Sequence, residues 1–362
     1  LNIADISIKD LFQQRFNFYF KLGISESDLK NKSVLEFCPG TGYNAYYLIK
    51  KCKIKKIQLV DHNPASVISL KKHLYKFSNA MILNKDVNKY YSKNKFDLTI
   101  IENALSGFKS PKKIFNRLLK FTNHKGTLVC TFTDPIGVFS EKLRYLLALM
   151  LIEQNKIKDF DARHLFLTKI FKRDLKYLSA HTRPPKKWVL DNLMNEKWMK
   201  KKIDFHFLNI TNILNSNKYI VKKISPSFYF DYGWYKRMTI KDYNKKIIKQ
   251  YKENKINFLD FETRFNKNLK EINNNLKQFN EILNLFSYDK KLSHSKLKEI
   301  KKIIFNLSRD LNKIKSKNKV SSSLSELSVN IDEFLNKKKI NYKSKYFYKF
   351  WGIGTQAISI YK

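Results

Sequence analysis

A chain of 362 residues with 43% hydrophobic content can form one large domain or two modest ones, and it has no run of about 18 apolar residues that would cross a bilayer. Its formal net charge is +41, yet only nine of its 72 basic residues are arginine, the side chain on which nucleic-acid sites rely. The lysine excess therefore favours a solvated surface, with weak and salt-dependent attraction to anionic partners or membranes, over a nucleic-acid site.

The first 135 residues alternate between strand and helix patterns. The patterns predict helices at 10–20, 42–51, 64–77 and 111–121, and buried strands at 33–37, 56–60, 81–83, 96–101 and 126–132. Strands that alternate with crossover helices indicate an α/β fold with a parallel, doubly wound sheet.

Helical patterns dominate most of the remaining chain, first over about 136–212 and then over the lysine-rich residues 236–345. In the second stretch, apolar residues from Leu269 to Phe286 follow helical spacing and predict an internal helix–helix contact, and Ser321–Ser323 predict a break. Alternatively, the surface of this stretch forms the interface of a homo-oligomer.

Strand-like runs at 218–230 and 347–361 flank the lysine-rich stretch. If the two runs pair, that stretch is an insertion into a hairpin. We therefore predict one domain from residues 1–235 and 346–362, which includes the first helical segment, and a separate helical insertion at 236–345.

The segment from Val34 to Asn44 reads Val-Leu-Glu-Phe-Cys-Pro-Gly-Thr-Gly-Tyr-Asn and indicates function most strongly. A strand containing Glu36 runs into a Pro-Gly-x-Gly turn that opens a helix, and the next strand ends in Asp61. This pattern describes a pocket for a ribose-bearing cofactor, and its two acids favour a cationic cofactor over a pyrophosphate. The alternatives are a dinucleotide fingerprint at 40–45, a backbone-capping role for Glu36 and a turn role for Asp61.

These residues resemble those of the class I S-adenosylmethionine-dependent methyltransferases over about 30–135, 213–235 and 346–362. The resemblance implies a Rossmann-like seven-stranded sheet with an antiparallel last strand, S-adenosylmethionine as cofactor, and methyl transfer. It also implies cofactor-binding residues in the glycine loop and after strands two to four: Glu36, Phe37, Cys38, Pro39, Gly40, Thr41, Gly42, Asn44, Asp61, His62, Asn63, Asp86, Val87, Glu102, Asn103 and Ala104. The ending Trp351–Gln356 is similar to a subset associated with surface-polysaccharide clusters.

Methyl transfer to an alcohol needs a general base, whereas a neutral amine or thiol needs none. Glu102, His164 and His181 are the candidate catalytic residues, and His164 also suits a structural role. Tyr229, Tyr232 and Trp234 could stack on a sugar or ring. No group of His and Asp residues has metal-ligand spacing, so no metal is expected.

The sequence thus predicts a methyltransferase for a small-molecule or sugar-containing acceptor. Two rivals are an RNA methyltransferase that uses the lysine-rich helices and an interaction protein that retains a degenerate methyltransferase fold. The three cysteines show no paired spacing and the N-terminal residues lack a signal-peptide pattern, so a cytoplasmic location is expected.

Overall fold

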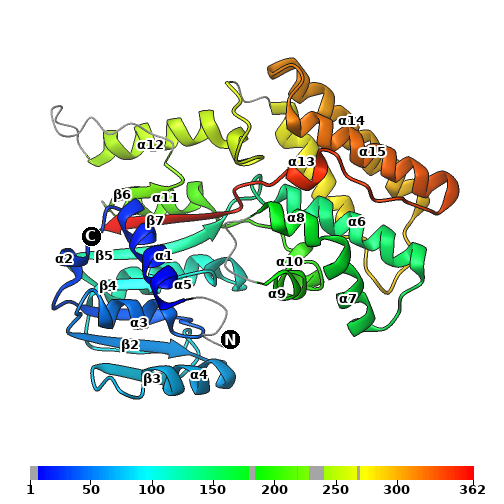
Figure 1. Ribbon diagram of the computed structural model, residues 1–362. Coiled ribbons are helices and arrows are strands. Elements are labelled where there is room, and N and C mark those ends of the chain that lie inside the picture. The colour runs from blue at the N-terminus through cyan, green and yellow to red at the C-terminus, as the bar shows by residue number, and fades with distance from the viewer. Residues whose placement is uncertain (1–6, 179–183, 218, 228–239, 267–269) are drawn as a thin grey trace. The chain divides into compact units, whose positions relative to one another are not determined.

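The computed structural model describes residues 7–178, 184–217, 219–227, 240–266 and 270–362 (Figure 1). Contacts divide the chain into two compact units. Unit 1 comprises Leu1–Thr133, Phe205–Tyr251 and Thr355–Lys362, and unit 2 comprises Asp134–Asp204 and Lys252–Gly354. Both helical stretches predicted from the sequence thus contribute to unit 2, whereas the predicted boundaries place the first of them with the sheet.

Unit 1 is built on a seven-stranded sheet in the order β3-β2-β1-β4-β5-β7-β6. Its strands are β1 (Ser33–Phe37), β2 (Lys56–Asp61), β3 (Ala80–Asn84), β4 (Phe96–Ile101), β5 (Thr122–Thr133), β6 (Ile220–Ser225) and β7 (Thr355–Tyr361). Strands β1 to β5 pair in parallel, and β7 is antiparallel to both β5 and β6. The predicted doubly wound sheet with an antiparallel last strand is confirmed.

The register places the carboxyl ends of the central strands at one edge of the sheet. Phe37 of β1 is paired with Val60 of β2 and with Ile101 of β4. The residues that follow these strand ends are therefore neighbours in space, although they are distant in sequence. The strand order reverses between β1 and β4, which is where open α/β sheets bind ligands.

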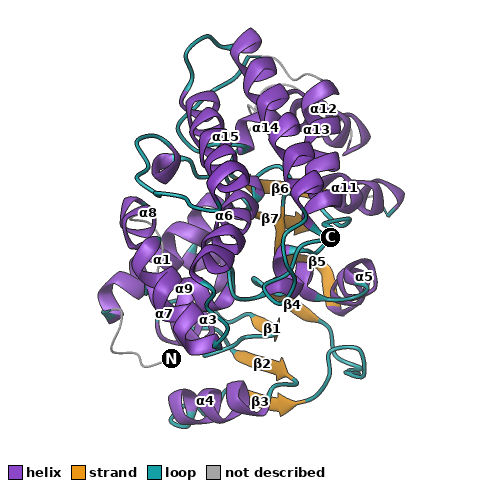
Figure 2. Ribbon diagram, turned by 90° about the vertical axis from the view of Figure 1, so that its right-hand side faces the viewer, coloured by secondary structure: helices purple, strands orange, loops and turns teal. Residues whose placement is uncertain are grey.

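Helices cover both faces of this sheet. Figure 2 shows α1 (Ile8–Lys21), α3 (Tyr43–Lys50) and α4 (Pro64–Leu74) on one side, and α5 (Pro111–Phe121) and α11 (Phe207–Ser216) on the other. Unit 1 also contains α2 (Glu26–Leu29), the 3-10 turn η2 (Leu105–Gly107) and most of α12 (Ile240–Asn254). Tyr19, Leu48 and Leu59 are buried together in the core between the first helices and the sheet.

Unit 2 is helical in its described residues. Its helices are α6 (Phe139–Asn155), α7 (Phe160–Ile170), α8 (Lys172–Tyr177), α9 (Pro185–Asp191), α10 (Glu196–Met199), α13 (Lys270–Leu283), α14 (His294–Ile314) and α15 (Lys319–Lys337), with 3-10 turns η3 (Lys255–Phe258) and η4 (Phe347–Lys349). The apolar stripe of α13 is buried, as predicted, and Phe279 packs edge-on against Phe139 at 5.0 Å between ring centroids. Leu269 lies outside the described residues.

Three local predictions are wrong in part. The run at 347–361 starts with η4, and β7 begins only at Thr355 because the aromatic side chains before it pack around Arg144 of α6. The run at 218–230 yields β6, which ends at Ser225, just before Pro226, and residues 228–230 lie outside the described residues. Ser321–Ser323 do not break a helix: Asn318 caps α15 there, and the Ser323 hydroxyl donates to the carbonyl of Lys319 at 2.8 Å.

Candidate functional site

The loop after β1 turns sharply through backbone conformations that suit glycine. Cys38, Gly40 and Gly42 have φ angles of 57°, 58° and 84°. A Cβ on Gly42 would lie 2.6 Å from Leu70 Cδ2, whereas a Cβ on Gly40 would meet nothing within 4 Å. Gly42 therefore allows α3 to start against α4, and Gly40 faces open space where a ligand can approach the backbone.

Glu36 is a buried acid with half of its carboxylate unused. Its side chain is 2% exposed, and Oε1 accepts a hydrogen bond from Asn44 Nδ2 at 3.1 Å. Oε2 is buried without a hydrogen-bond partner. Burial raises the pKa of Glu36 to about 8, against the opposing effect of the Asn44 hydrogen bond. A buried, unpaired acceptor of this kind is rare and marks a position where a ligand can supply the missing donor.

Helix α1 adds two residues that the sequence analysis missed. Arg15 forms a two-pronged ion pair with Glu102 at 2.6 and 3.1 Å, and Tyr19 Oη donates to Asn44 Oδ1 at 2.9 Å. Arg15 and Tyr19 are four residues apart and share one helical face, which is the only trace of their role in the sequence. Together they connect α1 to the first turn of α3 and to the loop after β4.

Asp61 ends β2 with its side chain buried at 5% exposure. Oδ1 accepts from the backbone N–H of Asn63 at 2.9 Å, so Asp61 does stabilise the turn after β2. Its other oxygen, Oδ2, takes no part in that hydrogen bond. Asn63 in turn caps α4 by accepting from Ala65 N at 3.0 Å. The side chain of His62 is 72% exposed, and its Nδ1 lies 3.9 Å from Asp61 Oδ1. Phe37 pairs with Val60, and the N–H of Cys38 donates to the carbonyl of Val60 at 2.9 Å, so Asp61 follows directly after the point where β2 meets the glycine loop.

The residues after β3 and β4 have mixed surroundings. Asp86 is exposed, and hydrogen bonds from the backbone and side chain of Asn88 lower its pKa. Val87 is buried. Asn103 is exposed in a left-handed conformation, with its N–H donating to Thr131 Oγ1 at 2.6 Å, and Ala104 precedes η2. Asp86 therefore stabilises a local turn through Asn88.

The other loop residues are mainly structural in their contacts. Phe37 packs in the core against Tyr90 and Phe121. Burial raises the pKa of the Cys38 thiol to about 12, so Cys38 is not a reactive nucleophile at neutral pH. The carbonyl of Pro39 accepts from Gly42 N at 3.1 Å, and the carbonyl of Thr41 lies 3.0 Å from His73 Nδ1.

The candidate catalytic residues belong to different parts of the chain: Glu102 is in unit 1 and His164 is in unit 2. His181 lies outside the described residues, as do Tyr229, Tyr232 and Trp234. His164 is in unit 2 at 7% exposure, with Nε2 2.7 Å from the carbonyl of Lys186, which gives it a structural partner. Both oxygens of Glu102 are engaged by Arg15. The described residues contain no group of three or more His, Cys, Asp or Glu side chains that could hold a metal ion.

Gln356 is another buried side chain of unit 1 with polar atoms that lack a hydrogen-bond partner. It lies on β7 opposite Phe132, one residue from the carboxyl end of β5, and is 0% exposed. Neither its amide oxygen nor its amide nitrogen has a hydrogen-bond partner. At the carboxyl-end edge of the sheet, Glu36 Oε2 and both polar atoms of the Gln356 amide are thus buried without a hydrogen-bond partner.

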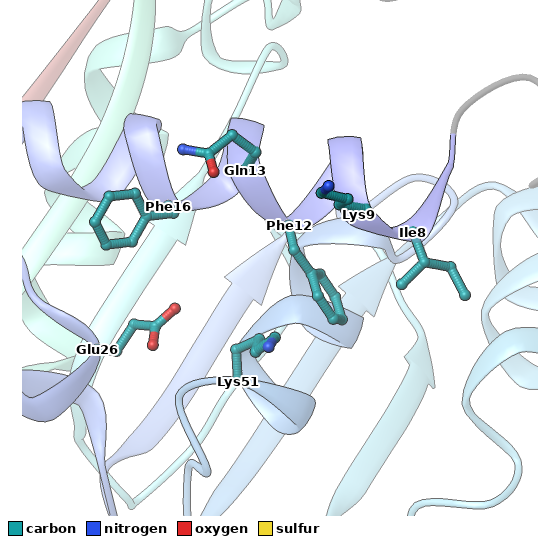
Figure 3. Close-up of a pocket in the computed structure, with 7 residues that line it drawn as sticks. All are labelled: Ile8, Lys9, Phe12, Gln13, Phe16, Glu26 and Lys51. Atoms are coloured by element: carbon teal, nitrogen blue, oxygen red, sulfur yellow. The ribbon is translucent and has the colours of Figure 1, made fainter.

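A surface depression of about 530 Å³ lies elsewhere on unit 1, along α1 (Figure 3). It is lined by Ile8, Lys9, Phe12, Gln13, Phe16, Glu26 and Lys51. The Lys51 ammonium lies 5.3 Å from the centre of the Phe12 ring, a cation–π contact. None of the predicted site residues that the structure describes lines this depression, so it is separate from the strand-end site.

The strand order and the antiparallel last strand define a Rossmann-like methyltransferase fold. No known family model matches the chain, and no curated protein matches it. Among the described residues, no helix combines the length and the apolar character needed to cross a membrane.

Several solved structures resemble part of the chain. N-methyltransferase NodS from Bradyrhizobium japonicum WM9, solved with S-adenosylhomocysteine, is 15% identical with a TM-score of 0.29, over 34% of this chain and 60% of that one. A methyltransferase from Clostridium acetobutylicum ATCC 824 is 17% identical with a TM-score of 0.30, over 36% and 53%. The glycopeptide N-methyltransferase MtfA, solved with S-adenosylmethionine, is 10% identical with a TM-score of 0.29, over 34% and 54%. This chain thus covers less than two thirds of each of these proteins.

Proposed function

We propose that the chain is an S-adenosylmethionine-dependent methyltransferase whose donor site lies at the carboxyl ends of β1, β2 and β4. The observation that carries the proposal is the buried Glu36 carboxylate, whose Oε2 has no partner, beside a glycine turn and next to the strand that ends in Asp61. Glu36 and Asp61 are both acids, which would repel a phosphate group. They fit a ligand with a ribose and a cationic amino-acid part better than a pyrophosphate cofactor.

The residues fit such a donor in distinct ways. The Asn63 N–H occupies Oδ1 of Asp61, so Oδ2 is the oxygen that would accept from the ribose hydroxyls. Glu36, with Asn44 fixing one oxygen, offers the other to an ammonium group. Gly40 leaves room for close approach. When bound, S-adenosylmethionine supplies an electrophilic methyl group on a sulfonium, and the protein's task is to align an acceptor with it and exclude water.

The remaining predicted residues complete this proposal. Asp86 and Val87 follow β3 on the adenine side, and Asn103 and Ala104 follow β4 on the methionine side, as the family resemblance implies. Glu102 is better suited to hold Arg15 and α1 over the site than to act as a base, because Arg15 engages both of its oxygens. Arg15 and Tyr19 are positioning residues in this proposal.

We further propose a small-molecule or sugar-containing acceptor and a cytoplasmic location. The resemblance of Trp351–Gln356 to a polysaccharide-related subset supports the acceptor class. So does Gln356, whose unpaired amide suits a hydroxyl-bearing ligand. All three cysteines are free, as expected in a reducing compartment.

The arginines weigh against an RNA acceptor. Each arginine in the described part of the chain has an intramolecular hydrogen bond or ion pair: Arg15, Arg117, Arg144, Arg163, Arg173, Arg264 and Arg309. Few guanidinium groups are therefore available to read bases or phosphates.

Calorimetry of the full chain with S-adenosylmethionine and S-adenosylhomocysteine tests the donor site. Asp61→Ala should weaken donor affinity by about tenfold or more, because a buried charged hydrogen bond is lost. Asp242→Ala removes an exposed acid on α12 of the same unit and should leave the affinity unchanged. Equal affinity in all three proteins would refute the role of Asp61. No binding to the wild type at millimolar donor would favour the degenerate-fold interaction protein.

A further inference from the structure

Unit 2 contains a cleft of about 390 Å³, and no predicted site residue in the described part of the chain lines it. Its walls come from Pro135 and Ile136, from residues 202–204 and from one side of α13. The volume is in the range of small-molecule sites, roughly 300–1,000 Å³. Six of its polar side chains are amides or amines: Lys142, Lys202, Lys277, Asn273, Asn280 and Asn284.

Lys142 is a buried cation at this cleft without a counter-ion. It is 6% exposed, and its Nζ donates to Asn280 Oδ1 at 2.6 Å and to the carbonyl of Lys201 at 3.3 Å. Both acceptors are uncharged. Within the described part of the chain, no carboxylate forms an ion pair with Lys142, and burial alone lowers its pKa to about 8. An ammonium group has three donors, so one N–H is still available.

The two acids that line the cleft do not compensate this charge. Asp204 pairs with Lys202 at 3.1 Å, and Glu281 lies 3.9 Å from Lys277. All four of these side chains are well exposed. A buried charge without a partner is unfavourable, and an anionic ligand is one way to satisfy it.

Helix packing does not account for Lys142. It does bridge α6 and α13 through Asn280, but these helices already meet through Phe139 and Phe279. A neutral or apolar side chain of similar length would maintain that contact without burying a charge.

We propose that this cleft binds a small, hydroxyl-bearing molecule with a phosphate group, and that Lys142 is the main contact of the phosphate. Lysine acts as a compact point charge that suits phosphate. Planar carboxylates are matched better by arginine, and none of the described residues that line the cleft is an arginine. Asn284 can donate to and accept from hydroxyl groups at the rim.

Thermal unfolding of the full chain tests the proposal at constant ionic strength, with inorganic phosphate, glucose 6-phosphate and glucose as probes. Two variants remove the site: Lys142→Met deletes the charge, and Asn280→Asp supplies an internal counter-ion of the same shape. Lys298→Met removes an exposed lysine on α14 of the same unit and is the matched control.

We expect both phosphates to raise the unfolding temperature of the wild type and of Lys298→Met. Glucose 6-phosphate should act at about tenfold lower concentration than inorganic phosphate, since the sugar adds contacts, and glucose alone should have little effect. Both site variants should lose the phosphate effect. If Lys142→Met does not fold, the Asn280→Asp variant decides.

Equal phosphate shifts in all four proteins would overturn the proposal, because they would report the general positive charge of the surface. If inorganic phosphate and glucose 6-phosphate act at the same concentration, the cleft binds a free anion, and the proposed contacts with hydroxyl groups of the ligand are overturned. None of these results depends on donor binding, so failure here and failure of the proposed methyl transfer can be told apart.

Discussion

At the scale of single residues, the site depends on a carboxylate that is buried before any ligand is present. Glu36 has one oxygen fixed by Asn44 and one without a partner. Such an arrangement destabilises the protein by itself, because the charged form is poorly solvated. It is also ready to interact with a cation, which is what a donor site for an ammonium group needs.

The raised pKa of Glu36 has a measurable effect on stability. Because its pKa in the folded protein is about 8 and its ordinary value is 4.5, the folded state retains a proton that the unfolded state loses between these values. The contribution is fully present below about pH 4.5 and is lost as the pH rises through 8. In this window we expect Glu36 to lower the free energy of unfolding by about 1.4 kcal/mol per pH unit.

Urea unfolding of the wild type and of Glu36→Gln at several pH values from 5 to 8 measures this slope. The variant should have a flatter dependence, because it cannot titrate. Glu271→Gln changes an exposed glutamate and should behave like the wild type. Parallel curves for the wild type and Glu36→Gln would show that Glu36 titrates normally.

The two loop glycines should respond differently to a methyl group. Gly42→Ala combines a φ of 84° with a Cβ 2.6 Å from Leu70, so it should lower the free energy of unfolding by more than about 1 kcal/mol. Gly40→Ala strains the backbone in a similar way, but its Cβ would meet no atom within 4 Å. It should therefore act mainly by lowering donor affinity. Parallel measurements of unfolding and of donor binding separate the two effects. A stability loss as large for Gly40→Ala as for Gly42→Ala would contradict this assignment.

At the scale of elements, α6 of unit 2 is held by a buried arginine. Arg144 is 0% exposed, pairs with Asp174 at 3.0 Å, donates to the carbonyls of Phe347 and Phe350, and lies 3.6 Å from the centre of the Trp351 ring. Burial raises the pKa of Asp174 in spite of Arg144. This pair ties α6 and α8 to the segment that precedes β7.

Removal of the Asp174 carboxylate should destabilise the protein, because it leaves the buried Arg144 charge without a counter-ion. We expect Asp174→Asn to lower the free energy of unfolding by roughly 3–5 kcal/mol. Asp204→Asn breaks the exposed pair with Lys202 and should change stability by less than about 1 kcal/mol. Chemical denaturation of both variants provides the comparison, and similar small losses would mean that Arg144 finds other partners.

At the scale of the whole molecule, the charge of +41 predicts attraction to polyanions without a specific site. We expect RNA to bind weakly at low salt and to dissociate near physiological ionic strength, because exposed lysines are screened. Mobility-shift titrations at two salt concentrations test this expectation. Tight binding that persists at the higher salt concentration would support the RNA rival.

The sequence by itself determined the features that depend on neighbouring residues. Strand and helix periods, the Asn63-Pro64 helix start and the glycine turn after β1 are local patterns, so the order of elements and the acids at the strand ends could be predicted. The Ser321–Ser323 prediction failed because serine suits both loops and the first turns of a capped helix.

Only the tertiary structure decided the contacts between distant residues. Arg15 and Glu102 are 87 positions apart, and Arg144 and Phe350 are 206 apart. No local pattern encodes such pairs, because folding brings them together through the burial of many other side chains. The same holds for the unpaired oxygen of Glu36 and the uncompensated charge of Lys142, which exist only because packing removes water from groups that would otherwise be hydrated.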